Sequence, residues 1–90
     1  MPQRFESDLS RRIRRRRREL SLTQQEVATR VGVTADHITL VEGGYRRLDL
    51  DRIPDLADAL RLDRTELCRE ALEERAPALY RELFSFPDIS

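Results

Sequence analysis

The sequence has few of the residues on which several classes of protein depend. It contains one cysteine, Cys68, and only three glycines, and all seventeen of its basic residues are arginine. A single cysteine excludes an intrachain disulfide, which agrees with a reducing cytosol. No apolar run approaches the roughly 20 residues that a membrane span needs, and the start of the chain lacks the apolar segment of a signal peptide. We therefore expect a soluble, cytoplasmic protein.

Residues that carry catalysis or hold metals are equally scarce. His37 is the single histidine and has no cysteine at metal-ligand spacing, and Cys68 is expected to be a small residue of the buried core. The chain has no glycine-rich phosphate loop and no nucleophile beside a base. We expect no enzyme activity, no cofactor and no metal site, and His37 is either a nucleic-acid contact or a surface residue without a role.

The net charge is zero, but the charges are unevenly distributed. Residues 1–47 hold eleven arginines and six acidic residues, whereas residues 48–90 hold six arginines and eleven acidic residues. The halves therefore carry +5 and −5, and this separation matters more for a nucleic-acid partner than the sum does. Arginine suits phosphate and guanine, although a GC-rich genome also explains the absence of lysine.

Helical patterns run through most of the chain, because Gly is scarce and no segment alternates apolar and polar residues. We predict helices over about 8–19 with Ser7 as cap, from 24 after a T-x-x-E capping box at Thr23, from 35 after the cap Thr34, from near 51, and from 64 after Asp63. Gly32 is expected to take a left-handed conformation at the end of the second helix. A further apolar stripe follows Pro77.

The second and third predicted helices, joined by Gly32-Val33-Thr34, have the pattern of a helix-turn-helix. Gly32 permits the sharp turn and Val33 fills the space between the helices. Ala28 is small enough for the two helices to approach closely. The outer face of the second helix of the motif is then available to enter a major groove.

The stretch from Ile13 to Leu67 contains the segments RELSLTQQEVATRVGVTADHITLVEGG (18–44) and IPDLADALRLDRTEL (53–67). In these segments it resembles the DNA-binding domain of the lambda-repressor/Cro family, also called xenobiotic-response-element regulators. The resemblance covers about 60 of the 90 residues and rests on several spaced features, among them the L-T-Q-x-E-V-A run and the later L-A-x-A-L. It implies an all-α fold, namely a five-helix lambda-repressor-like domain over residues 1–75 with a C-terminal helical extension over 76–90.

The resemblance also implies the residues that contact DNA. Gln24 would bind a backbone phosphate, the start of the third helix would contact bases, and Arg17 would pair internally with Glu42 while reaching a phosphate. The implied set is Arg17, Thr23, Gln24, Gln25, Thr34, Ala35, Asp36, His37, Thr39, Leu40, Tyr45, Arg46 and Arg47.

The sequence departs from the family at two recognition positions. Ala35 and Asp36 stand where Gln, Arg or Ser is common. Asp36 cannot bind the acceptors of guanine but can accept from cytosine N4, and Ala35 and Leu40 can touch thymine methyl groups. Asp36 is equally well explained as a helix-start residue that faces water.

The C-terminal apolar residues are predicted to form a homodimer interface, because twofold dimers are the commonest assembly. The alternative is that this segment folds back onto the first helix near Phe5. The predicted interface residues are Leu72, Leu79, Tyr80, Leu83, Phe84 and Phe86.

These observations predict a sequence-specific transcriptional repressor that binds a palindromic operator as a homodimer. The first alternative is an antitoxin or autoregulator of a small operon, whose acidic C-terminal half also binds a protein partner. The second is an interaction adaptor that has lost DNA binding.

Overall fold

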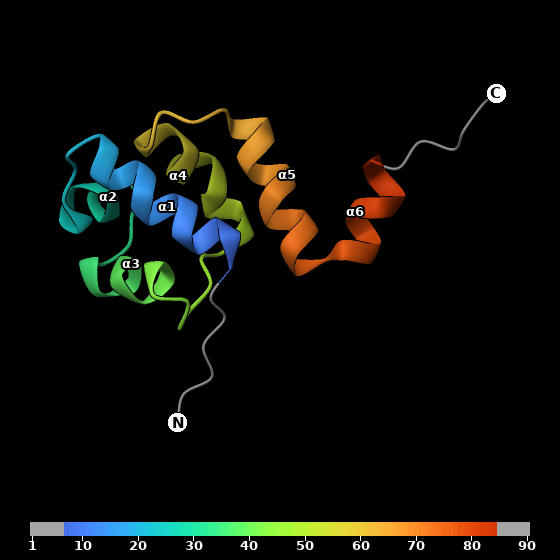
Figure 1. The fold of residues 1–90 in the computed structure, drawn as a ribbon, viewed down its shortest axis with the longest axis horizontal. Helices are drawn as coiled ribbons and strands as arrows, with labels where there is room; N and C mark the ends of the chain where they lie inside the picture. Colours follow the sequence, from blue (N-terminus) through green and yellow to red (C-terminus); the bar gives the residue numbers. More distant parts are fainter. Residues whose placement is uncertain (1–6, 85–90) are drawn as a thin grey trace.

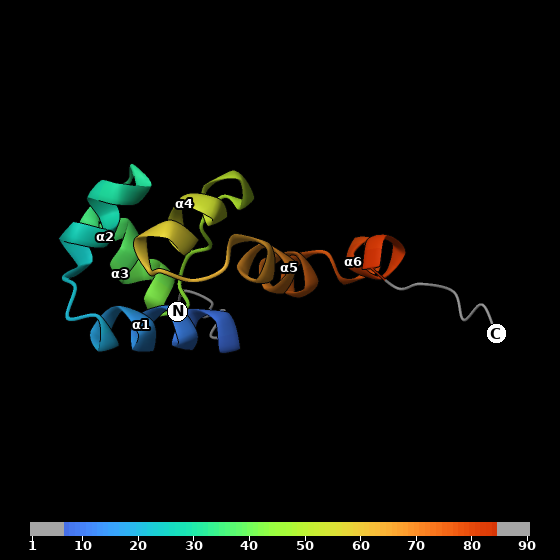
Figure 2. The ribbon, with the colours of Figure 1, turned by 90° about the horizontal axis from the view of Figure 1, so that it is seen from above.

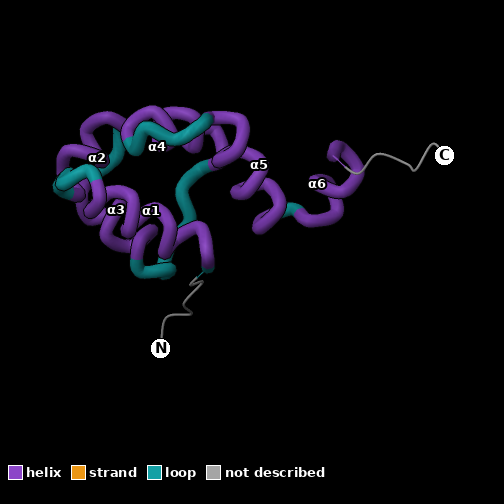
Figure 3. Tube along the Cα trace, turned by 45° about the horizontal axis from the view of Figure 1, so that its top comes forward, coloured by secondary structure: helices purple, strands orange, loops and turns teal. Residues whose placement is uncertain are grey.

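The computed structural model of the chain describes residues 7–84, and these residues form helices and loops without a strand (Figures 1 and 3). The predicted all-α fold is therefore confirmed. Five helices and a short 3-10 turn precede a sixth helix: α1 (Asp8–Glu19), α2 (Gln24–Val31), α3 (Ala35–Glu42), η1 (Leu50–Arg52), α4 (Ile53–Ala59), α5 (Arg64–Arg75) and α6 (Pro77–Phe84).

Side-chain caps fix where four of the helices begin. Thr23 accepts a hydrogen bond from the backbone N–H of Glu26, whose side chain in turn accepts from the N–H of Thr23. Ser7 and Ser10 form a similar reciprocal box at α1. Thr34 and Asp63 cap α3 and α5 in the same local way. Such caps contribute about 1 kcal/mol each, and they explain why the predicted starts are correct.

The turn between α2 and α3 requires glycine at position 32. Gly32 has a φ of 86°, in the left-handed region. A Cβ there would lie 3.0 Å from Nη1 of Arg52, which donates to the carbonyl of Val31 at 2.9 Å. The guanidinium of Arg52 thus satisfies a carbonyl at the C-terminus of α2 and links η1 to the helix-turn-helix. A side chain at position 32 would strain the backbone and crowd this contact.

The core lies among α1 to α5 and is made of aliphatic side chains. The buried residues are Leu9, Ile13, Val27, Ala28, Val31, Ile38, Val41, Leu48, Ile53, Leu56, Ala57, Ala59, Leu60, Leu67 and Ala71. Val33 packs against this core from the turn, as predicted, but it is only half-buried. The prediction for Cys68 is wrong: its side chain is half-buried at the edge of the core, because this position of α5 lies on the border of its inner face.

The last helix, α6, stands apart from the other helices, and the helix it packs against is α5 (Figures 1 and 2). Tyr80 and Phe84 are half-buried with their ring centroids 5.0 Å apart, and the guanidinium of Arg69 lies over Phe84. Leu79 and Leu83 are exposed by 52% and 56%. The predicted contacts of Phe5 and Phe86 lie outside the described residues.

An ion pair joins the last turn of α1 to the last residue of α3. Nε and Nη2 of Arg17 donate to the two carboxylate oxygens of Glu42 at 2.7 and 2.9 Å. The side chain of Glu42 is only 2% exposed and that of Arg17 only 12%. The hydrogen bond to Glu42 raises the pKa of Arg17 above its ordinary value. The predicted pair is thus present, is bidentate and is largely excluded from solvent.

Removing one partner of this pair should cost far more stability than removing an exposed carboxylate. Glu42→Ala leaves the guanidinium of Arg17 without its partner, which costs about 3–5 kcal/mol when burial is complete. Asp36→Ala removes an exposed acidic residue from the same helix and serves as the control. Thermal unfolding should show a large fall in Tm for Glu42→Ala and a small change for Asp36→Ala. Equal shifts would mean that the pair contributes nothing specific.

Candidate nucleic-acid interface

The face of α3 that points away from the core is formed by the residues predicted to read bases. Asp36, Thr39 and Leu40 are exposed, with Leu40 at 40%. Ala35 is half-buried and packs against the core, and His37 is also half-buried, with no hydrogen-bond partner for its Nε2 among the described residues. Both interpretations of His37, a nucleic-acid contact and a surface residue without a role, remain open.

A hydrogen-bond network holds the side chain of Gln24 at the start of α2. Its Nε2 donates to Glu42 at 3.2 Å, and its Oε1 accepts from the hydroxyl of Thr39 at 2.7 Å. Glu42 is itself held by Arg17. The network links α1, α2 and α3, so the side chain expected to bind a phosphate is fixed relative to the helix expected to read bases.

Arg17 retains some capacity to donate further hydrogen bonds. Beside its two bonds to Glu42, its Nη1 donates to the carbonyl of Leu22 at 2.9 Å. A guanidinium has five N–H groups. Two of them remain for a ligand, so the ion pair and a phosphate contact are compatible.

Three other predicted residues are engaged in local hydrogen bonds. Thr23 and Thr34 cap α2 and α3, respectively. Gln25 donates to the hydroxyl of Thr29, one turn along α2, at 3.1 Å. Gln25 and the two capping residues are exposed, so each borders the surface around Gln24 and α3 while also stabilising a helix.

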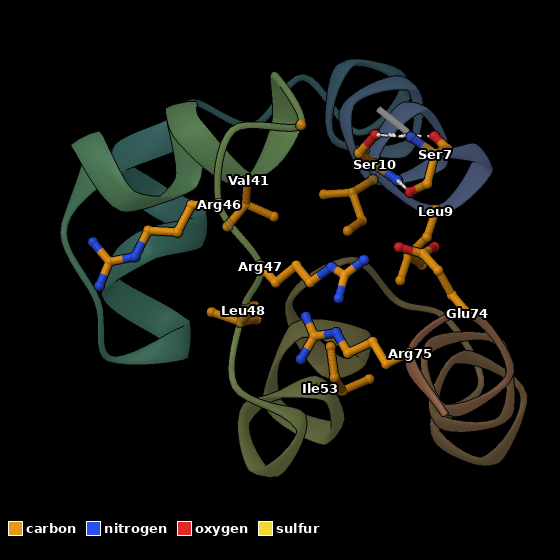
Figure 4. A pocket seen from close by; sticks show the side chains of 12 residues that line it. Ser7, Leu9, Ser10, Val41, Arg46, Arg47, Leu48, Ile53, Glu74 and Arg75 are labelled. Carbon is orange, nitrogen blue, oxygen red and sulfur yellow. Dashed lines mark hydrogen bonds between the residues drawn. The ribbon is translucent and has the colours of Figure 1, made fainter. Parts of the chain in front are cut away.

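The two arginines after α3 point in different directions (Figure 4). Arg46 extends away from the cavity beneath the loop, whereas Arg47 reaches toward Arg75 of α5. Burial lowers the pKa of Arg75, and the positive charge of Arg47 lowers it further. The cavity offers only ≈ 20 Å³, about the space of one water, so it cannot hold a nucleotide or a cofactor. Of the two side chains, Arg46 is the better placed to meet DNA beside α3.

Some of these contacts had no signal in the sequence. The bond between Gln24 and Thr39 spans 15 residues, and that between Gln24 and Glu42 spans 18. Neither spacing is a helical or strand period, so only the packing of α2 on α3 brings the groups together. The bond from Arg52 to Val31 is of the same kind.

Within residues 7–84, no cluster of histidine, cysteine and acidic side chains has the arrangement of a metal site. No described helix is long and apolar enough to cross a membrane.

Comparison with known proteins places this geometry in a family. Residues 8–69, more than half of the chain, match the model of a helix-turn-helix domain. Comparison with curated proteins gives no match.

Two solved structures are similar to the chain. The restriction-modification controller protein C.AhdI from Aeromonas hydrophila is 32% identical, with a TM-score of 0.60, over 66% of this chain and 86% of that one. The clp gene regulator ClgR from C. glutamicum is 20% identical, with a TM-score of 0.59, over 76% of this chain and 88% of that one, and this likeness concerns the fold alone.

The sequence motif, the α2–α3 geometry and the family match agree with one another. The chain belongs to the helix-turn-helix family and is a transcriptional regulator of the lambda-repressor/Cro type.

Proposed function

We propose that the protein is a repressor that binds a palindromic operator as a homodimer, with α3 in the major groove. The observation that carries this proposal is the network that fixes Gln24 against Thr39 and Glu42, directly beside the exposed face of α3. A phosphate contact and a base-reading helix held in one rigid frame can set the register of the protein on a duplex. The similarity to a protein described as a restriction-modification controller supports a regulatory role.

The phosphate contacts of the proposed complex come from three elements. Gln24 lies at the N-terminus of α2, where backbone N–H groups and the helix dipole favour an anion. The remaining N–H groups of Arg17 and the outward-pointing side chain of Arg46 add positive charge. Such contacts give affinity without sequence preference.

Base preference in the proposed complex comes from the exposed face of α3. Asp36 lies in the first turn of this helix, the end that enters the groove. Its carboxylate can accept from cytosine N4, and the exposed Leu40 can contact a thymine methyl group. Ala35 lies beside them, but it packs against the core, so we expect it to contribute less to base preference than Asp36 and Leu40.

Dimerisation is assigned to α6 and the adjoining surface of α5. Leu79 and Leu83 are spaced by four residues and exposed, so they form an apolar stripe on a helix that stands off the body. A mainly apolar depression lined by Pro54, Cys68 and Leu72 lies beside it. Binding of two half-sites one turn of duplex apart would require such a dimer to hold its two α3 helices about 34 Å apart.

The alternative function is an antitoxin or autoregulator in which a different protein covers the same stripe. The observation that favours this alternative is the exposure of Leu79 and Leu83, which a protein partner could cover. The two functions share the DNA interface and differ in what binds α6.

Affinity for duplex DNA should fall steeply with salt. Each neutralised phosphate contributes about −0.9 to the slope of log affinity against log salt. Arg46→Ala should weaken binding to every sequence alike and flatten the slope by about one such contact. Arg47→Ala, whose side chain points toward Arg75, should flatten it less. Fluorescence anisotropy with a labelled duplex measures both quantities. A flat response from about 50 to 200 mM salt in the unaltered protein would rule out DNA binding as its main function.

Asp36→Ala should relax base preference at one position of each half-site. The loss of discrimination should be roughly 1–3 kcal/mol if the carboxylate accepts from a base. The measurement is the affinity of both proteins for a bound duplex and for each of its single-base-pair variants. Gln24→Ala is the matched control, since it should lower all affinities by a similar factor. Unchanged discrimination in Asp36→Ala would leave Asp36 as a helix-start residue.

Deleting residues 76–90 should give a folded monomer that binds DNA far more weakly and without palindromic preference. Leu79→Glu combined with Leu83→Glu should have the same effect, because charges on the stripe oppose its burial. Arg81→Glu, on the opposite side of α6, is the control and should stay dimeric. Sedimentation at micromolar concentration measures the oligomeric state. A full-length monomer there, with or without operator, would contradict the dimer.

A further inference from the structure

The arginines of α1 divide into those with an acidic partner and those without. Five of the seven form ion pairs: Arg11 with Asp8, Arg12 with Glu66 and Glu70, Arg15 and Arg16 with Glu19, and Arg17 with Glu42. Arg14 and Arg18 form none within residues 7–84. They are separated by four residues and therefore lie one turn apart on the same face of the helix.

Both of these arginines line one hollow of the surface. The hollow has a volume of ≈ 350 Å³, and its other walls include Gln24, Thr39, Leu40 and Tyr45. The side chain of Arg18 is exposed and that of Arg14 is half-buried, and α1 lies against α3 at this place (Figure 1). The hollow thus adjoins the face of α3, and it is much larger than the roughly 10–15 Å³ that one water needs by the same measure.

The charges around the hollow leave it positive. The acidic residue in its wall is Glu42, whose two oxygens both accept from Arg17, so that the pair contributes no net charge. Glu19 borders the depression on the other side of Arg14 and Arg18, where it pairs with Arg15 and Arg16. The side chains of Arg14 and Arg18 therefore line an open space beside Gln24, and no carboxylate of residues 7–84 pairs with either of them.

We propose that Arg14 and Arg18 bind a DNA backbone phosphate in this hollow, which extends the part of α1 in the proposed interface beyond Arg17. The inference rests on the proposed function and extends it to two residues that the helix-turn-helix pattern does not include. A phosphodiester fits the site because guanidinium groups donate paired hydrogen bonds to phosphate oxygens. The spacing of one helical turn lets both side chains converge on one group.

The test compares two double variants of equal charge. Arg14→Ala with Arg18→Ala removes the proposed contact, and Arg11→Ala with Arg15→Ala is the control. The control pair lies on the same helix with the same spacing, and its partners are Asp8 and Glu19. Both variants lose two positive charges, so long-range attraction to DNA falls equally. Thermal unfolding of both checks that they remain folded.

The salt dependence of duplex binding separates contact from general charge. The Arg14/Arg18 variant should flatten the log–log slope by about 0.9, the value for one lost phosphate contact, relative to the control. Equal slopes for the two variants would overturn the inference while leaving DNA binding by the unaltered protein intact. An unaltered protein that fails to bind duplex would instead overturn the proposed function, and the inference with it.

Duplexes with one neutral methylphosphonate linkage locate the contact. Scanning this linkage along a bound duplex should reveal a phosphate whose neutralisation weakens the unaltered protein and the control but not the Arg14/Arg18 variant. A merely structural role for the two arginines would leave the variant sensitive at every position where the unaltered protein is sensitive.

Discussion

The geometry of the DNA-facing surface depends on the buried ion pair between Arg17 and Glu42. A carboxylate that is 2% exposed is tolerated only because a bidentate guanidinium meets it. The same carboxylate accepts from Gln24, which accepts from Thr39. One pair therefore fixes three helices relative to one another. It also holds Gln24, the proposed phosphate contact, beside α3, the helix proposed to read bases. Buried pairs of this kind are weak stabilisers compared with apolar packing. Their value in this fold lies in specifying one arrangement of α1, α2 and α3.

Arginine serves two purposes in this chain, and the composition cannot separate them. Arg52 donates to the carbonyl of Val31 and Arg16 to that of Leu60, where α2 and α4 end. These contacts satisfy carbonyls that a helix end leaves unpaired. Arg12 of α1 neutralises acidic residues of α5, namely Glu66 and Glu70. Many arginines of the basic half thus bind carbonyl or carboxylate groups within the fold. The arginines of α1 without an acidic partner among residues 7–84 are therefore the better candidates for contacts with DNA.

Helix positions were predictable because their signals are local. A capping side chain acts three residues away, and Gly32 marks its turn by a conformation that other residues avoid. The pair of Arg17 and Glu42 followed from the resemblance to a family. The network around Gln24 was not predictable, because it joins residues that only tertiary packing brings together. The burial of Cys68 was predicted wrongly, since periodicity gives the inner face of α5 but not where its border lies. The direction of α6 depends on the backbone at Ala76, with φ −138° and ψ 65°, for which the sequence holds no signal beyond the proline that follows.

Reading of a specific duplex by α3, from a twofold assembly of the chain, can be measured by selecting bound sequences from a random duplex pool. This one experiment reports binding, preference and symmetry together. We expect enrichment of a site with two inverted half-sites whose centres are about 10 base pairs apart, one turn of the helix. Recovery of the input distribution would contradict DNA recognition by α3, and an enriched single half-site would contradict the twofold assembly.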